Sequence, residues 1–149
     1  MRTQVNEIKI SYQGGVKSNA WKKVTTSQDA AQLIYGNWDY GTIGLQECFK
    51  VVLMNNANRV KGIYQISQGG MTSTVVDLRI MFAVILKSAS LAILLTHNHP
   101  SGLLRPSQAD IQLTEKIGKA AELFDIKLLD HLILAPDGGF YSFSDDGLL

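Results

Sequence analysis

Residues 91–110, LAILLTHNHPSGLLRPSQAD, decide the fold because they join a strand to a helix through a short polar loop. The run 91–96 is predominantly apolar, which is typical of a central strand buried on both faces. Two prolines and a glycine then favour a turning loop, and apolar residues recur at helical spacing through 107–124. We therefore predict a strand, a loop and a helix, with the loop bringing the start of the helix back toward the end of the strand.

The rest of the chain predicts further strands and helices around this unit. Strands are predicted at 5–12, 47–54, 59–67, 126–135 and 140–143, and helices at 26–35 and 75–89. An asparagine-rich loop at 55–58 favours a hairpin. This alternation predicts an α/β fold with a mixed β-sheet flanked by helices. The 149 residues fit one domain, in which 1–43 contribute a strand and a helix to the same unit as 44–149.

The composition is that of a folded protein with almost balanced charge. Hydrophobic residues make up 46% of the chain and charged residues 18%, which argues against disorder. The formal net charge is +1, so the chain lacks the basic excess that polyanion binding usually needs. Lys22 and Lys23, like Arg59 and Lys61, are expected to form solvated surface. Net charge therefore does not indicate a nucleic-acid partner.

The single cysteine, Cys48, excludes an internal disulfide and a cysteine-rich zinc site. We expect it to behave as a small buried hydrophobe, and Trp21 and Trp38 to be packing residues. A single cysteine fits a reducing compartment. Residues 1–9 lack a signal-peptide run, and 75–95 carry too many polar residues for a membrane span. We therefore expect a cytoplasmic protein without membrane contact.

The polar loop carries the chemistry. Because His97 and His99 are two residues apart, an extended backbone projects both imidazoles to the same side. With Asp110 they form a three-ligand set, and catalytic zinc typically has three protein ligands and a water. Zinc lowers the pKa of that water to about 7. Glu47 is the candidate proton acceptor, and Ser107 is a candidate donor to an oxyanion.

Several interpretations of these residues stay open at this stage. Ser107-x-x-Asp110 is also an ordinary helix cap, and both roles are compatible. Two histidines and an aspartate also describe a non-haem iron site, although that chemistry usually occurs on a jelly-roll barrel. His131 is expected to be a core residue or to orient a ligand, with Asp130 as one partner for an imidazole. The zinc-deaminase signature is missing, which argues against base deamination.

These residues resemble the JAMM motif of JAB/MPN metallopeptidases, in which His-x-His is followed, after seven residues, by Ser-x-x-Asp. The chain has Asn98 between the histidines, where the general pattern has Ser or Thr. His-Asn-His-Pro-Ser-Gly followed by Pro-Ser-x-x-Asp is similar to the RadC branch. So are Asp-His-Leu-Ile at 130–133 and Tyr-Ser-Phe at 141–143. The resemblance covers about residues 44–149.

The resemblance implies zinc held by His97, His99 and Asp110, with Glu47 as general acid/base and Ser107 supporting the oxyanion. It also implies a fold like that of cytidine deaminase. Well-understood members cleave peptide or isopeptide bonds of ubiquitin-like modifiers. Longer RadC proteins carry an N-terminal helix-hairpin-helix region associated with DNA. Residues 1–43 lack its glycine-rich hairpin, so we expect a short form without that region.

The leading hypothesis is a zinc-dependent hydrolase in which metal-bound water attacks a peptide or isopeptide bond of a peptide or protein substrate. The alternative is a metal-containing module that binds or processes nucleic acid. A third possibility is a scaffold that keeps zinc for stability. The sequence does not identify the substrate or the oligomeric state.

Overall fold

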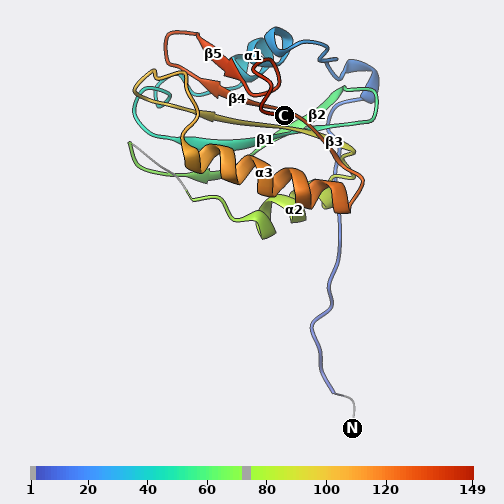
Figure 1. Cartoon of the computed structure of the whole chain (residues 1–149). Helices are drawn as coiled ribbons and strands as arrows, with labels where there is room; N and C mark the ends of the chain where they lie inside the picture. Colours follow the sequence, from blue (N-terminus) through green and yellow to red (C-terminus); the bar gives the residue numbers. More distant parts are fainter. Residues whose placement is uncertain (1–2, 72–74) are drawn as a thin grey trace.

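In a computed structural model of the chain, residues 3–71 and 75–149 are described (Figure 1). Residues 1 and 2, the start of the predicted N-terminal part, lie outside the described residues. The elements follow in chain order: η1 (Ser18–Ala20), α1 (Ser27–Gly36), β1 (Cys48–Met54), β2 (Val60–Gln68), α2 (Leu78–Lys87), β3 (Ala92–Asn98), α3 (Gln108–Leu123), β4 (Lys127–Leu134) and β5 (Phe140–Ser142).

The five strands form one mixed sheet, as the predicted α/β class has it, and their order is β2-β1-β3-β4-β5. Strand β1 is antiparallel to both β2 and β3, and β4 is antiparallel to β5. Strands β3 and β4 are parallel, and α3 is the crossover that parallel neighbours require. The sheet therefore places β3 at its centre, with the end of β3 facing the start of α3.

Helices cover both faces of this sheet (Figure 1). Helix α1 packs on one face through Ala30, Ala31 and Ile34. Helices α2 and α3 cover the other face, in a second core cluster that contains Met81 and Ile117. Alternate residues of β3 contribute to the two clusters, and all its residues are buried, as a central strand requires.

The predicted strand at 5–12 is wrong. The structure has no helix or strand there, and Figure 1 shows the N-terminal segment projecting from the body. Val5, Ile8 and Ile10 are 85%, 89% and 82% exposed. Alternating hydrophobicity favours a strand only where a second strand pairs with it. Residues 22–23, and not 5–12, pair with the beginning of β2. They do so through a bridge between Lys23 and Arg59 and a hydrogen bond from the Val60 amide to the Lys22 carbonyl.

Two other element boundaries differ from expectation, and the second of them affects the site. Helix α2 is shorter than predicted, beginning at Leu78 rather than residue 75. Strand β3 ends at Asn98 rather than residue 96. Its backbone pairing with β4 continues to the register pair Asn98–Leu134. The first histidine of the motif is therefore held by the sheet and not by the loop.

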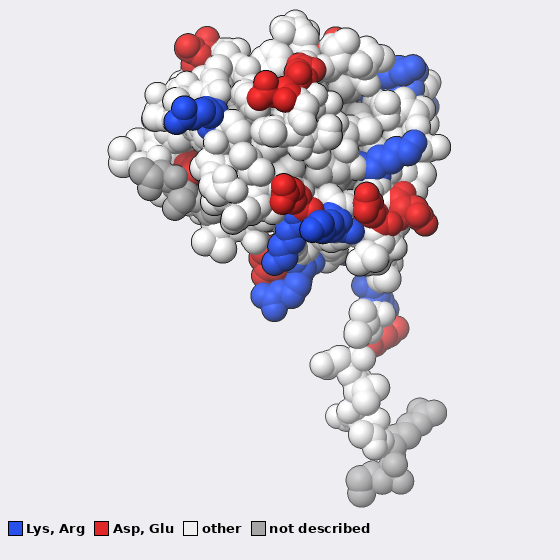
Figure 2. Space-filling model, viewed as in Figure 1, with Lys and Arg blue, Asp and Glu red and all other residues white. Residues whose placement is uncertain are grey.

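The expected packing roles of Cys48 and Trp38 are confirmed, because both belong to the core under α1. Arg59 and Lys61 are not simply solvated. The Arg59 guanidinium donates to the Trp21 carbonyl at 2.9 Å, and the Lys61 ammonium donates to the Ser88 carbonyl. Acidic and basic side chains are interspersed on the face shown in Figure 2. Among the described residues, no helix combines the length and hydropathy needed to cross a bilayer.

Candidate metal centre

The two histidines of the motif meet at the end of β3. His97 lies within the strand, not just past it as the sequence suggested, and its side chain is almost fully buried. His99 follows the strand, and its amide still donates to the Leu134 carbonyl of β4. The Nε2 atoms of His97 and His99 are 3.0 Å apart. The extended backbone therefore directs both imidazoles to one point, as the two-residue spacing predicts.

Asp110 reaches the same point from the first turn of α3. Its Oδ2 atom lies 3.4 Å from the Nε2 atom of His97 and 3.4 Å from that of His99. The same carboxylate accepts a hydrogen bond from the Ser107 amide, while the Ser107 hydroxyl accepts one from the Asp110 amide. This capping box fixes the start of the helix. The cap therefore holds the carboxylate in the position from which it faces the imidazoles.

Glu47 comes from the residue before β1. Because Phe49 of β1 is the register partner of His97, Glu47 lies beside the histidine cluster. Its Oε1 atom is 3.8 Å from the His97 Nε2 atom, and the residue is 6% exposed. Glu47, His97, His99 and Asp110 each offer one ligand atom, and these atoms all lie within 4.8 Å of one another.

Asn98 has a role in the site that the sequence analysis did not identify. By strand alternation its side chain points to the face opposite His97. Its amide nitrogen donates to the carbonyls of Ile43 and Gln46, at 2.7 and 2.9 Å, and its Oδ1 accepts from the Cys48 amide at 2.7 Å. These three bonds hold the backbone on both sides of Glu47. The residue between the histidines thus fixes the position of the glutamate.

The outer ring nitrogens of both histidines also have partners. The His99 Nδ1 atom donates to the Leu103 carbonyl at 2.7 Å. The His97 Nδ1 atom lies 2.7 Å from the Nε2 atom of His131, whose Nδ1 atom is 2.7 Å from the Thr114 hydroxyl. His131 is therefore both a core residue and a contact of a candidate ligand.

Asp130 does not orient an imidazole, contrary to our expectation. Its Oδ1 accepts from the backbone amides of His131 and Ser144, and its Oδ2 accepts from the Ser142 hydroxyl. The carboxylate is therefore used to fix the chain around β4 and the segment after β5. Within the described part of the chain, none of its hydrogen bonds goes to the His131 ring.

The site is electrostatically unusual. Burial raises the pKa of Glu47, although the two histidines act in the opposite direction. Burial also acts to raise the pKa of Asp110, but its close contacts with the His97 and His99 rings outweigh it and hold that pKa far below its usual range. The hydrogen bond with Asp110 raises the pKa of His99. The two carboxylates of the cluster therefore have pKa values shifted in opposite directions.

The donor set fits a divalent cation. In tetrahedral coordination with bonds of about 2.0–2.2 Å, neighbouring ligand atoms are about 3.3–3.5 Å apart. The two distances of 3.4 Å between Asp110 and the imidazoles match this spacing, and the distance of 3.0 Å between the imidazoles is slightly shorter. Two nitrogens and one carboxylate oxygen suit zinc. Glu47 is the fourth member of the cluster, and its carboxylate, at 3.8 Å, lies farther from the His97 Nε2 atom than the other two ligand atoms do.

A cleft opens beside these side chains. It has a volume of about 460 Å³. Its lining combines site residues with apolar ones: Glu47, Met71, His99, Pro100, Ser101, Leu103, Arg105, Pro106, Ser107, Ala109, Asp110 and Leu113. Ser107 is exposed in this cleft, and its hydroxyl hydrogen is not used by the cap because the oxygen acts there as the acceptor. A substrate in the cleft therefore has access to both Glu47 and Ser107.

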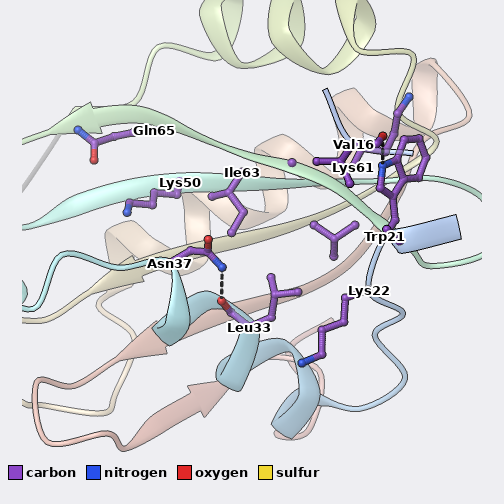
Figure 3. Close-up of a pocket in the computed structure, with 12 residues that line it drawn as sticks. Val16, Trp21, Lys22, Leu33, Asn37, Lys50, Lys61, Ile63 and Gln65 are labelled. Carbon is purple, nitrogen blue, oxygen red and sulfur yellow. Dashed lines mark hydrogen bonds between the residues drawn. The ribbon is translucent and has the colours of Figure 1, made fainter. Parts of the chain in front are cut away.

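A second groove lies over β2 and beside α1, with a volume of about 410 Å³. Figure 3 shows the ammonium groups of Lys22, Lys50 and Lys61 pointing in different directions around an apolar floor. The Asn37 amide is already bonded to the Leu33 carbonyl at 2.8 Å. Because its polar groups do not converge, this groove offers no catalytic arrangement comparable to the histidine cluster.

Comparison with known proteins agrees with this geometry. Residues 24–148 match the family model described as the RadC-like JAB domain, so the match begins about twenty residues before the resemblance seen in the sequence. A UPF0758 protein of Flavobacterium johnsoniae is 44% identical over 130 residues, covering 85% of this chain and 54% of the relative.

Other relatives show the same pattern. A UPF0758 protein of Porphyromonas gingivalis is 43% identical over 104 residues, covering 70% of this chain and 46% of its own length. One from Clostridium kluyveri is 38% identical over 128 residues, covering 85% of this chain and 54% of its own length. The chain thus spans about half the length of the curated relatives it matches.

Proposed function

The chain belongs to the RadC-like JAB family, and from that premise we propose that it is a zinc-dependent hydrolase that cleaves a peptide or isopeptide bond. Family membership and the cluster of Glu47, His97, His99 and Asp110 fit a metallohydrolase. The identity of the metal, the roles of the individual residues and the bond that is cleaved are the content of the proposal.

The observation that carries the proposal is the convergence of three ligand atoms from separate elements. The two imidazole Nε2 atoms and the Asp110 Oδ2 atom lie within 3.4 Å of one another, at the edge of an open cleft. His97, His99 and Asp110 would hold the ion. A zinc ion bound there would polarise a carbonyl group and make water nucleophilic at neutral pH.

Two side chains beside the candidate ligands supply the remaining steps, which are proton transfer and stabilisation of the oxyanion. The Glu47 carboxylate takes the proton of the attacking water and transfers it to the leaving nitrogen, and burial, which raises the pKa of Glu47, makes the carboxylate a stronger base for the first step. The Ser107 hydroxyl donates to the oxygen that becomes negatively charged on the attacked carbonyl. Glu47 is only 6% exposed, so bulk water has limited access to its carboxylate.

Metal analysis is the first test. Purified protein is expected to hold one zinc ion per chain and to lose it to a chelator, with a lower melting temperature because a ligand that binds only the folded state stabilises it. His97→Ala should abolish stoichiometric zinc. Wild-type protein that takes up no zinc, under conditions in which it remains folded, would contradict the proposal.

Glu47→Gln separates hydrolysis from zinc binding for structure alone. The variant should retain zinc but lose about 10²–10⁴-fold in turnover, the usual contribution of a positioned acid/base. A library of peptides and isopeptides in which cleavage releases a fluorophore is the appropriate assay. Ser107→Ala should lower turnover by about 10²-fold or more, with zinc retained. Unchanged turnover in Glu47→Gln would refute its assigned role.

The alternative of a nucleic-acid module is tested by a different measurement. The charges are mixed on the face shown in Figure 2, and the net charge is only +1. Titration with single- and double-stranded DNA should therefore show no tight binding at low salt. Binding that weakens linearly with the logarithm of salt concentration would favour the alternative instead.

A further inference from the structure

We propose that Thr114 and His131 are positioning residues that hold His97 in the one tautomer able to bind a metal through its Nε2 atom. The inference rests on the proposed function only in the identity of the group that Nε2 binds. The tautomer itself is a property of the protein without metal. The His97 ring bonds to His131, and the His131 ring bonds in turn to the Thr114 hydroxyl.

His97 and His99 are positioned by different kinds of partner. The His99 Nδ1 atom bonds to the Leu103 carbonyl, which only accepts hydrogen bonds. The Nδ1 of His99 must therefore carry the proton. The partner of His97 is a second imidazole, His131, at 2.7 Å. An imidazole nitrogen either donates or accepts, so this pair alone does not fix where the proton lies.

Thr114 removes that ambiguity. Its hydroxyl is 2.7 Å from the Asp110 carbonyl, which only accepts, so the hydroxyl donates there. The hydroxyl oxygen must then accept from the Nδ1 atom of His131, also at 2.7 Å. With its proton on Nδ1, a neutral His131 presents an unprotonated Nε2 to His97. His97 donates its own Nδ1 proton there, and its Nε2 lone pair points to the cluster.

The surroundings keep this arrangement rigid. His131 is fully buried, and its ring stacks on Phe143 with ring centres 4.6 Å apart. Phe49 stacks on the His97 ring, with an angle of 9° between the planes. Thr114 lies on α3 one helical turn after Asp110. The chain of bonds therefore connects one candidate ligand, His97, to the backbone of another, Asp110.

The Thr114 pair of variants is the sharper experiment. Thr114→Ser retains the hydroxyl, whereas Thr114→Val keeps the shape and removes it. Long-range ¹H–¹⁵N NMR of metal-free protein at about pH 8, above the ordinary imidazole pKa, reports which nitrogen of each histidine carries the proton. There are only three histidines to assign. Wild type and Thr114→Ser should show His97 protonated on Nδ1, and Thr114→Val should populate the Nε2-protonated form.

A second pair tests His131 itself. His131→Gln retains one acceptor for His97 and one donor for Thr114, whereas His131→Phe keeps the aromatic stack and removes both. Zinc affinity, measured by competition with a chromophoric chelator, should fall by about 10–100-fold in His131→Phe and in Thr114→Val. His131→Gln and Thr114→Ser should recover most of that loss.

The outcomes separate this proposal from the proposed function. If the wild type binds no zinc but Thr114→Val changes the His97 tautomer, the positioning role of Thr114 and His131 is supported and the proposed zinc site is contradicted. If zinc binds but His97 keeps its Nδ1 proton in folded Thr114→Val protein, the positioning role is refuted. Circular dichroism shows whether each variant is folded. If His131→Phe does not fold, the comparison of Thr114→Ser with Thr114→Val alone tests the positioning role.

Discussion

Asp110 and Asp130 are both largely withdrawn from solvent, yet their oxygen atoms are used in opposite ways. Among the described residues, every hydrogen bond that the Asp130 carboxylate accepts comes from an amide or hydroxyl group of the chain around β4 and β5. Asp110 accepts one amide hydrogen bond, from the helix cap, and directs the same oxygen to two imidazoles beside a cleft.

The contrast shows that burial alone does not distinguish a functional carboxylate from a structural one. Burial raises the pKa of Asp130 despite its hydrogen bonds. At Asp110 burial acts in the same direction, but the close contacts with the His97 and His99 rings reverse the net shift of the pKa. The partners of the oxygen atoms therefore distinguish the two sites. Matched substitutions at both positions can test this distinction.

The largest expected difference is in metal affinity. Asp110→Asn removes a charged candidate ligand, so zinc affinity should fall by more than about 100-fold, the upper range for loss of an outer partner. Asp130→Asn should change the affinity by less than about threefold, because its carboxylate faces other groups. Competition with a chelator measures both constants. Equal losses in the two variants would show that the distinction between the carboxylates is wrong.

The next difference is in stability without metal. Asp130→Ala leaves a buried amide, a partly buried amide and a buried hydroxyl without their acceptor, so the free energy of unfolding should fall by about 2 kcal/mol. Asp110→Ala should cost less, because water in the cleft can replace its oxygen. Urea denaturation in the presence of a chelator gives both values, and a smaller loss for Asp130→Ala would contradict the comparison.

The sequence predicted the fold where neighbouring residues determine it. The apolar run of β3, the hairpin loop at 55–58 and the cap of α3 all depend on residues close in the chain. The segment 5–12 has the same alternation as a strand, but pairing depends on a partner that the sequence does not reveal. The end of β3 was also missed, because backbone pairing with β4 extends the strand through polar residues.

The candidate site was predictable to the extent that its motif is local. The spacing of His97 and His99 fixes their shared direction, and Asp110 lies in the first turn of the next helix. The role of Asn98 depends on contacts between distant segments and was not predicted. For His131 the sequence predicted a core or ligand-orienting position, but not its bonds to His97 and Thr114. The sequence contained a signal for each residue. Strand alternation turns the Asn98 side chain away from His97 and His99. Thr114, which bonds to His131, lies one helical turn after Asp110.

A smaller effect concerns the cap that positions Asp110. Ser107→Ala removes the side-chain acceptor for the Asp110 amide, which typically costs about 1 kcal/mol. Thr can supply the same oxygen, so Ser107→Thr should recover most of the loss. Urea denaturation of the metal-free variants checks this order. If Ser107→Ala is as stable as wild type, the capping box does not contribute to holding Asp110 in place.

The smallest expected effect is a pH dependence of stability that has opposite signs at Asp130 and Asp110. Because burial raises the pKa of Asp130 in the folded protein, the folded state retains the proton more strongly than the unfolded state does. The stabilising contribution of Asp130 is therefore complete below its unfolded pKa and is lost as pH rises through the folded pKa. Asp130→Asn removes this titration.

The free energy of unfolding of wild type, relative to Asp130→Asn, should thus decrease as pH rises from about 4 toward neutrality. The same difference measured for Asp110→Asn in metal-free protein should run the other way, because the folded pKa of Asp110 is lowered and its contribution is lost as pH falls. Urea titrations at a series of pH values give both slopes. Slopes of the same sign would mean that the two carboxylates experience similar environments. That result would contradict the distinction based on their different contacts.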